Sequence, residues 1–188
     1  MGGRGNLFLV AWGNGGNGLE DTSHIVKVSP TGRVLAHWQD GSVDSLALDA
    51  SGNIFAFASS PVVSAGCANV PHCGAAPDAD YYIDKLSPGG RLLAHWKPPL
   101  PPQPWRGATP LPLTMAVDAG GSVYIASQDR IVKLSHSGRP LSSLVRSRTY
   151  MIGLAIGPHG NLLVADTGNN RLYKLSSTLR QVAQWGAN

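Results

Sequence analysis

The sequence predicts an all-β protein built from four repeated units of short strands. Three observations support this prediction. The 188 residues include 23 glycines and 14 prolines, few segments have the apolar period of a helix, and one residue pattern recurs four times. Frequent glycine and proline favour turns over long helices, and recurrence along the chain indicates a repeat architecture. A chain of this length fits one domain with a sizeable core.

The most regular feature is a lysine followed by an aliphatic residue and a serine. An arginine follows six residues after each lysine, and a bulky apolar residue follows eleven residues after it. We interpret each copy as two strands joined by a tight turn in which glycine supplies a positive φ. The lysines are Lys27, Lys85, Lys133 and Lys174; the arginines are Arg33, Arg91, Arg139 and Arg180; the apolar residues are Trp38, Trp96, Leu144 and Trp185.

Two more strands are expected ahead of this hairpin. Strands of the first type recur in all four copies, within residues 5–11, 52–58, 121–127 and 160–166. Strands of the second type lie just upstream, within residues 45–51, 114–120 and 153–159, and the first copy lacks one. In chain order the four strands of a unit are called a, b, c and d. Four units would hold 16 strands, so the missing strand a leaves 15 recognisable strands.

Four-stranded antiparallel units in series are typical of the blades of a β-propeller. The nearly continuous apolar a strands would lie nearest the axis and the d strands on the outer rim. The bulky residue that ends each d strand would cover the gap to the next blade. We expect a single domain, 1–188, with blades at about 5–40 (lacking strand a), 44–97 (with an insertion at 59–81), 113–145 and 152–186.

The last copy, residues 153–186, carries the stretch VADTGNNR and resembles an NHL repeat. This resemblance implies a propeller in which Asp166, Asn169, Asn170 and Arg171 form a structural motif that braces the b–c turn. The other copies depart from the signature: alanine or serine replaces the aspartate, and the first two copies lack the arginine.

The same resemblance implies six blades, so four blades make about two thirds of a ring. Three arrangements stay open: a closed four-bladed ring, a partial arc of a larger propeller, and an arc completed by a second chain. Self-association through open blade edges is expected in the last two arrangements, because unpaired strands invite pairing.

The long connections are expected to gather on one face. In a propeller the b–c and d–a loops share a face, and every long or unusual segment falls in these two classes: 12–23, 59–81, 97–112 and 146–150. Variation confined to one face of a repeat protein indicates its binding side. We therefore expect a binding module for a protein or peptide, with no cofactor and no catalytic residues.

The candidate ligand contacts are the cations of this face and one aromatic residue. Of the 15 lysines and arginines, ten occupy repeat positions and are expected to form a solvated framework. The other five are Arg4, Lys97, Arg106, Arg146 and Arg148. Apolar area and charge-assisted hydrogen bonds favour contacts from Trp105, Arg106, Arg146 and Arg148.

Two alternative functions remain. Arginines near an aromatic residue, a net charge of +4 and the RNA-binding members of NHL-containing families are compatible with RNA binding. A lyase- or lactonase-like enzyme would hold a metal in the central channel. Asp44, Asp49 and Asp118 lie beside strand a, but the last two open ordinary turns. His37 and His95 are expected on the surface and to be dispensable, so we predict no metal site.

The insertion at 59–81 contains both cysteines. Cys67 and Cys73 are a disulfide candidate, because a small loop would restrain the insertion. The alternatives are unpaired thiols and a zinc site in which both cysteines and His72 bind the ion with Asp78 or Asp80. A disulfide and a protein ligand favour an extracellular or cell-surface context. No apolar run approaches the roughly 20 residues that span a bilayer, so we expect no membrane insertion.

Overall fold

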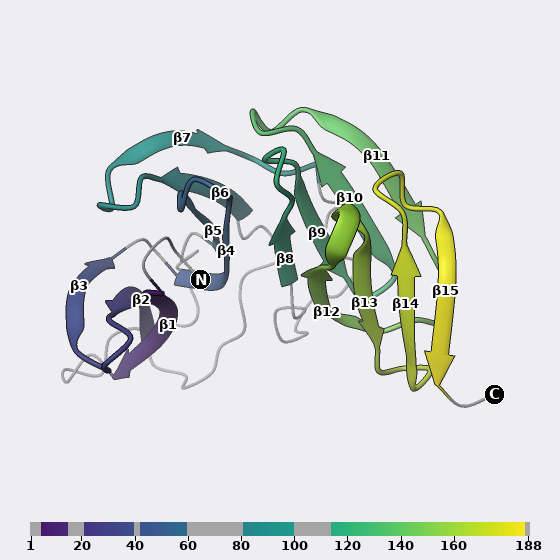
Figure 1. Cartoon of the computed structure of the whole chain (residues 1–188), viewed down its shortest axis with the longest axis horizontal. Helices are drawn as coiled ribbons and strands as arrows, with labels where there is room; N and C mark the ends of the chain where they lie inside the picture. The colour runs from purple at the N-terminus through teal and green to yellow at the C-terminus, as the bar shows by residue number, and fades with distance from the viewer. Residues whose placement is uncertain (1–4, 15–20, 40–41, 60–80, 100–113, 187–188) are drawn as a thin grey trace, which may run out of the picture.

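A computed structural model describes residues 5–14, 21–39, 42–59, 81–99 and 114–186 of the chain (Figure 1). Fifteen strands form four antiparallel sheets in chain order, and the described residues include one short 3-10 turn, Pro158–Gly160, and no α-helix. The structure confirms the all-β fold and the β-propeller arrangement of four blades. No helix in the described ranges is long and apolar enough to cross a membrane.

Each sheet contains consecutive strands. The first is β1 (Leu7–Asn14), β2 (Asp21–Val28) and β3 (Val34–Gln39); the second is β4 (Ser42–Leu48), β5 (Ile54–Ser59), β6 (Tyr81–Leu86) and β7 (Leu92–Trp96). The third is β8 (Thr114–Val117), β9 (Val123–Ser127), β10 (Arg130–Leu134) and β11 (Pro140–Val145); the fourth is β12 (Met151–Ile156), β13 (Leu162–Asp166), β14 (Arg171–Leu175) and β15 (Gln181–Gly186).

The sheets stand side by side in an arc. The main contacts between sheets join β4 to β1, β2 and β8, and join β12 to β8 and β9. The a strands β4, β8 and β12 therefore lie on the inner side, and Figure 1 shows the d strands β3, β7, β11 and β15 on the outer rim. The first and fourth sheets lie at opposite ends of the arc in this view.

The c–d turn is built in the same way in all four sheets. In the first sheet the amide of Ser29 donates to the carbonyl of Arg33, and the amide of Gly32 donates to the carbonyl of Ser29. The Ser29 hydroxyl also accepts the Arg33 amide at 3.0 Å. The equivalent backbone bonds close the turns at Ser87, Ser135 and Ser176. The recurring serine is therefore explained by the geometry of the turn.

Two of the repeat lysines, Lys27 and Lys133, make contacts between sheets, which corrects the expectation of a solvated framework for these two residues. The Lys133 side chain is only 14% exposed. Its Nζ lies 5.0 Å from the centre of the Tyr124 ring and donates to the carbonyl of Ser177 in the next sheet at 3.0 Å. Lys27 likewise donates to Pro88 of the second sheet at 3.0 Å. These lysines thus tie a c strand to the c–d turn of the following sheet.

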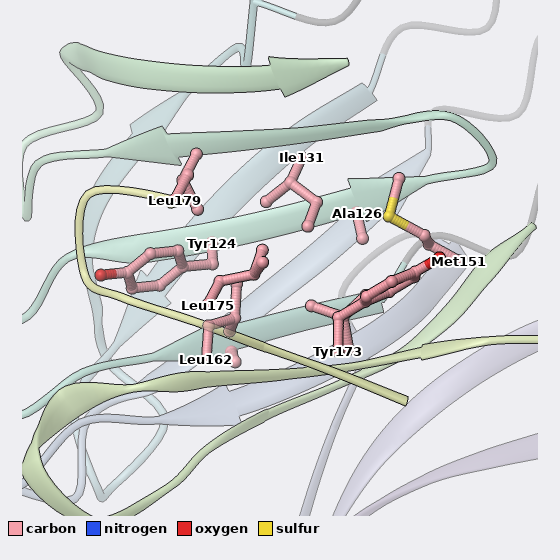
Figure 2. Packing of buried hydrophobic residues seen from close by; sticks show 10 residues of the cluster. Tyr124, Ala126, Ile131, Met151, Leu162, Tyr173, Leu175 and Leu179 are labelled. Atoms are coloured by element: carbon pink, nitrogen blue, oxygen red, sulfur yellow. The ribbon is translucent and has the colours of Figure 1, made fainter. Parts of the chain in front are cut away.

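Apolar side chains fill the space between neighbouring sheets. Figure 2 shows the cluster between the third and fourth sheets, where Tyr124 and Ile131 face Leu162, Tyr173 and Leu175. All five are at most 4% exposed. Equivalent clusters lie between the first and second and between the second and third sheets. Burial of these faces is the main force that holds the blades together.

Two a–b turns are closed by the aspartates that the sequence assigns to turns. Asp49 Oδ1 accepts the amides of Ser51 and Asn53, both at 2.9 Å. Asp118 Oδ1 accepts the Ser122 amide at 2.8 Å. The structure confirms both carboxylates as turn residues. The Asp49 carboxylate keeps its charge readily, because hydrogen bonds from Asn53 and the charge of Lys85 outweigh its desolvation and lower its pKa.

Candidate ligand-binding site

The face with the b–c and d–a connections is here called the loop-rich face. Its described segments include the short turn Gln128–Asp129, the connection 146–150 and the turn 167–170. Two predicted contacts, Trp105 and Arg106, lie outside the described residues, and so do the disulfide candidates Cys67 and Cys73. Arg146 and Arg148 lie in the connection between the third and fourth sheets.

Arg146 is held against the fourth sheet. Its guanidinium carbon lies 4.5 Å from the centre of the Tyr173 ring, and Nη2 donates to Oε1 of Gln181 at 2.5 Å. Stacking over an aromatic ring suits the planar guanidinium. Arg146 therefore fastens the connection to the last blade and has only its remaining N–H groups for a ligand.

Arg148 is exposed and is positioned through its backbone. It has a φ of 58°, a left-handed conformation that non-glycine residues rarely adopt. Its carbonyl accepts a hydrogen bond from Nδ2 of Asn169 at 2.9 Å. Asn169 thus stabilises a strained residue whose side chain is free to face solvent on the loop-rich face.

Asp166 fixes the neighbouring residue of the same connection. Its Oδ1 accepts the amide of Tyr150 at 2.9 Å, and its Oδ2 accepts Nδ2 of Asn169 at 2.7 Å. Asp166 is 1% exposed. The DTGNN stretch, residues 166–170, therefore braces the preceding d–a connection as well as its own turn. The sequence motif predicts only the bracing of the turn. Asn170 has a φ of 52°, and Arg171 pairs with Asp166 and Gly186 in the strand register.

Asp44 is a further residue of the loop-rich face, at the start of the innermost strand of the second sheet. It sits at a β-bulge between Val43 and Ser45. Bulges redirect side chains and are frequent next to functional sites. The equivalent bulge in β12 lies between Met151 and Gly153 and carries Ile152. A single carboxylate therefore takes a position that is apolar in the fourth sheet.

The Asp44 side chain is half-buried, and one of its two carboxylate oxygens is fully buried. Its Oδ2 is inaccessible and has no hydrogen-bond partner among the residues that the structure describes. Desolvation raises the pKa of Asp44 from 3.8 to about 6. Burial and, to a smaller degree, the charge of Asp44 also raise the pKa of Tyr81, whose ring stacks on Phe57 with 5.5 Å between centroids. Buried acceptors in native proteins are usually satisfied, so this oxygen is a candidate acceptor for a group outside the described residues.

Asp44 is not among the site residues that the sequence predicts. The available signal was a lone charge in the segment SVDSLAL, where the fourth copy has the apolar YMIGLAI. The backbone beside Asp44 is also anchored, because the Val43 amide donates to the buried hydroxyl of Ser23 in the first sheet.

The described residues around Asp44 do not form the ligand set of a zinc site. No group of three or more histidine, cysteine, aspartate or glutamate side chains comes together in the part of the chain that the structure describes. A catalytic or structural zinc normally has at least three protein ligands. The donor set at Asp44 suits a single hydrogen-bond donor or cation.

Comparison with known proteins supports the fold alone. No family model and no curated protein matches the chain, so the likeness to NHL repeats stays a prediction. The chain is similar to solved β-propellers. It is 20% identical to a streptogramin B lyase over 87% of this chain and 48% of that one, with a TM-score of 0.56.

Two other solved structures also combine low sequence identity with high coverage of this chain. A gluconolactonase from Xanthomonas campestris is 10% identical over 89% of this chain and 52% of that one, with a TM-score of 0.58. A catalytically inactive virginiamycin B lyase from Staphylococcus aureus, solved with quinupristin, is 13% identical over 96% and 60%, with a TM-score of 0.54. The chain thus spans about half the length of the proteins that it matches.

Proposed function

We propose that this chain is a binding module that takes a peptide segment of a protein on its loop-rich face. The observation that carries the proposal is the half-buried Asp44 carboxylate, one oxygen of which has no hydrogen-bond partner in the described ranges of the chain. A ligand that brings an ammonium, a guanidinium or an amide N–H group to the accessible part of this half-buried carboxylate would compensate its desolvation. Such donors are abundant on lysine, arginine and the backbone of a peptide.

Arg148 supplies a second type of contact on the same face. Its exposed guanidinium suits a carboxylate, and the hydrogen bond from Asn169 to the Arg148 carbonyl holds its backbone in place. The bond from the Tyr150 amide to Asp166 fixes the same connection two residues later. Preorganised contacts favour binding because less conformational entropy is lost. A peptide with both a basic and an acidic group is therefore the ligand class that the described part of this face fits best.

Peptide display against the folded chain tests this proposal. Selected peptides are expected to be enriched in lysine or arginine and to bind Asp44→Asn and Arg148→Ala more weakly than the unchanged chain. Arg139→Ala, in a c–d turn on the opposite face, is the matched control and is expected to bind normally. If Asp44→Asn keeps its affinity and Arg139→Ala loses it, the ligand binds the face with the c–d turns, and the proposal is wrong.

Salt distinguishes a peptide from RNA. Nucleic-acid affinity falls steeply with ionic strength because counterions are released on binding. A peptide held by one or two ion pairs should respond much less. A steep salt dependence with single-stranded RNA, and no selected peptide, would favour the RNA alternative.

An enzyme is the second candidate function. A carboxyl group with a pKa of about 6 can act as a general acid or base near neutral pH, and two of the similar structures are described as a lyase and a gluconolactonase. Assays with quinupristin and with gluconolactone test this candidate. Turnover that disappears in Asp44→Asn would support it, and absence of turnover with both substrates would leave the binding module as the better account.

A further inference from the structure

The interfaces between blades contain a knob and a hole. The indole of Trp38, at the end of β3, fills the space above Gly90 in the c–d turn of the second sheet. A Cβ atom added to Gly90 would lie 1.9 Å from Trp38 Nε1. Trp96 fills the space above Gly138 in the same way, at 2.4 Å from such an atom. Only glycine permits this approach.

The interface between the third and fourth sheets differs at both of these positions. Leu144 replaces the tryptophan, and the turn of the fourth sheet has Leu179 instead of glycine. Leu179 has a φ of 62° and is 5% exposed, and both leucines belong to the packing between the third and fourth sheets. A smaller knob thus accompanies a side chain in the hole, so the two positions complement each other in size.

The ends of the arc leave one knob and one hole unused. Trp185, which ends the last d strand, is 50% exposed. Gly32, in the turn of the first sheet, has a φ of +83°, and no described atom lies within 4 Å of a Cβ built on it. Trp185 therefore has the position of Trp38 and Trp96 without a glycine below it, and Gly32 has the position of Gly90 and Gly138 without an indole above it.

Other apolar residues of the two end faces are also exposed, although the equivalent residues inside the arc are buried. Leu7 and Leu9 of β1 are 44% and 48% exposed, whereas their equivalents Ile54 and Ala56 in the second sheet are fully buried. At the other end Leu172 is 39% exposed, whereas its equivalents in the other three sheets have no exposed surface. An open depression of about 290 Å³ lies beside Leu172, Trp185 and Gly186.

We propose that the last sheet of one copy docks on the first sheet of a second copy, head to tail, with Trp185 over Gly32. Lys174 fits the same register. Its equivalents Lys27 and Lys133 donate to the second residue of the following c–d turn, which in the first sheet is Pro30. The contact continues the packing between blades and needs no new type of interface.

Two copies would close the ring. The chain covers 48% and 52% of two solved propellers that it matches, so two copies have about the length of one such chain, whereas the resemblance to NHL repeats implies two thirds of a ring. A head-to-tail contact that closes gives a ring with rotational symmetry and leaves no free face. The two end sheets of one copy lie at opposite ends of the arc and cannot meet while the three internal interfaces persist.

Sedimentation velocity over a range of concentrations tests this proposal. The unchanged chain is expected to dimerise, and Trp185→Ala is expected to raise the dissociation constant by more than about tenfold, as for a central aromatic anchor. Gly32→Asn should have the same effect, because asparagine tolerates positive φ and its side chain fills the hole. Leu141→Ala, an exposed leucine of β11 away from both end faces, is the control and should leave the dimer unchanged.

Mixing the two variants provides a test that does not depend on either variant alone. Trp185→Ala keeps an intact first sheet, and Gly32→Asn keeps an intact last sheet. An equimolar mixture should therefore regain one good interface and form a heterodimer. A mixture that stays monomeric although both variants melt cooperatively, a dimer that persists in Trp185→Ala, or an unchanged chain that stays monomeric would each overturn the proposal.

Discussion

Trp96 and Gly138 occupy complementary positions across the boundary between the second and third sheets: the indole fills the space that any side chain at Gly138 would need. A Cβ atom on Gly138 would lie 2.4 Å from Trp96 Cδ1, and the backbone φ is +82°. One glycine thus serves two purposes. It permits the left-handed turn residue and it admits the tryptophan that seals the blade boundary.

Gly138→Ala is expected to destabilise the protein by about 2–4 kcal/mol, because strain at positive φ adds to overpacking against the indole. Thermal and urea unfolding measure the effect. Gly160→Ala is the matched control, because Gly160 has a φ of +71° with open space around it. The stability that Gly160→Ala loses therefore measures the backbone strain alone. Equal losses in the two variants would show that the indole contact is unimportant.

His95 and His37 are expected to differ, which corrects the sequence reading that both are dispensable. His95 Nδ1 lies 2.6 Å from Oδ1 of Asp84, a residue only 6% exposed. His37 faces Val26 in the equivalent register. His95→Ala leaves a buried carboxylate without its partner and should lower the free energy of unfolding by about 1–3 kcal/mol. His37→Ala should change it little in the same urea titration.

Asp166→Ala is expected to loosen the connection that carries Arg148 and Tyr150. The variant loses the acceptor for the Tyr150 amide and for Asn169, which should lower stability by about 1–3 kcal/mol. It should also weaken peptide binding, because Arg148 is no longer held in place. Asn161→Ala is the control: it removes the bond from Asn161 to Pro158 on the opposite face and should leave affinity intact. Equal affinity in the two variants would argue against this role of the DTGNN stretch.

The stability of the protein is expected to fall as the pH rises from about 4 to 6. Burial raises the pKa of Asp44 from 3.8 to about 6, so the folded state holds a proton that the unfolded state has lost in this range. The contribution is fully present below the unfolded pKa and is lost through the folded pKa. After allowance for partial exposure the loss is about 1–2 kcal/mol. Urea titrations at both ends of the range should show a flatter profile in Asp44→Asn; an identical slope would contradict the assigned burial.

Most of the fold follows from local sequence signals. The Lys-aliphatic-Ser pattern and its arginine predict the c–d hairpin, because the serine side chain and backbone close the same turn in every sheet. Tryptophans at the ends of d strands predict packing between blades, and Trp38 and Trp96 confirm it. Such contacts depend on neighbours in the sequence or on a fixed repeat register, so the chain alone reveals them.

The candidate site was less predictable because it depends on contacts between distant segments. Asp166 binds the amide of Tyr150, 16 residues earlier, and the sequence motif does not show that direction. The role of Asp44 requires knowledge that its oxygen is buried and unpaired. Trp105 and Arg106 stay predictions, because they lie outside the described residues.

The affinity of one display-selected basic peptide at pH 5 and at pH 7.5, for the unchanged chain and for Asp44→Asn, tests the central claim most directly. With a pKa of about 6, the Asp44 carboxylate is mostly protonated at the lower pH and ionised at the higher. Affinity should therefore rise by up to about tenfold between them, and the rise should be absent in Asp44→Asn. An affinity that does not change with pH, or that changes equally in Asp44→Asn, would contradict the claim that Asp44 receives the ligand.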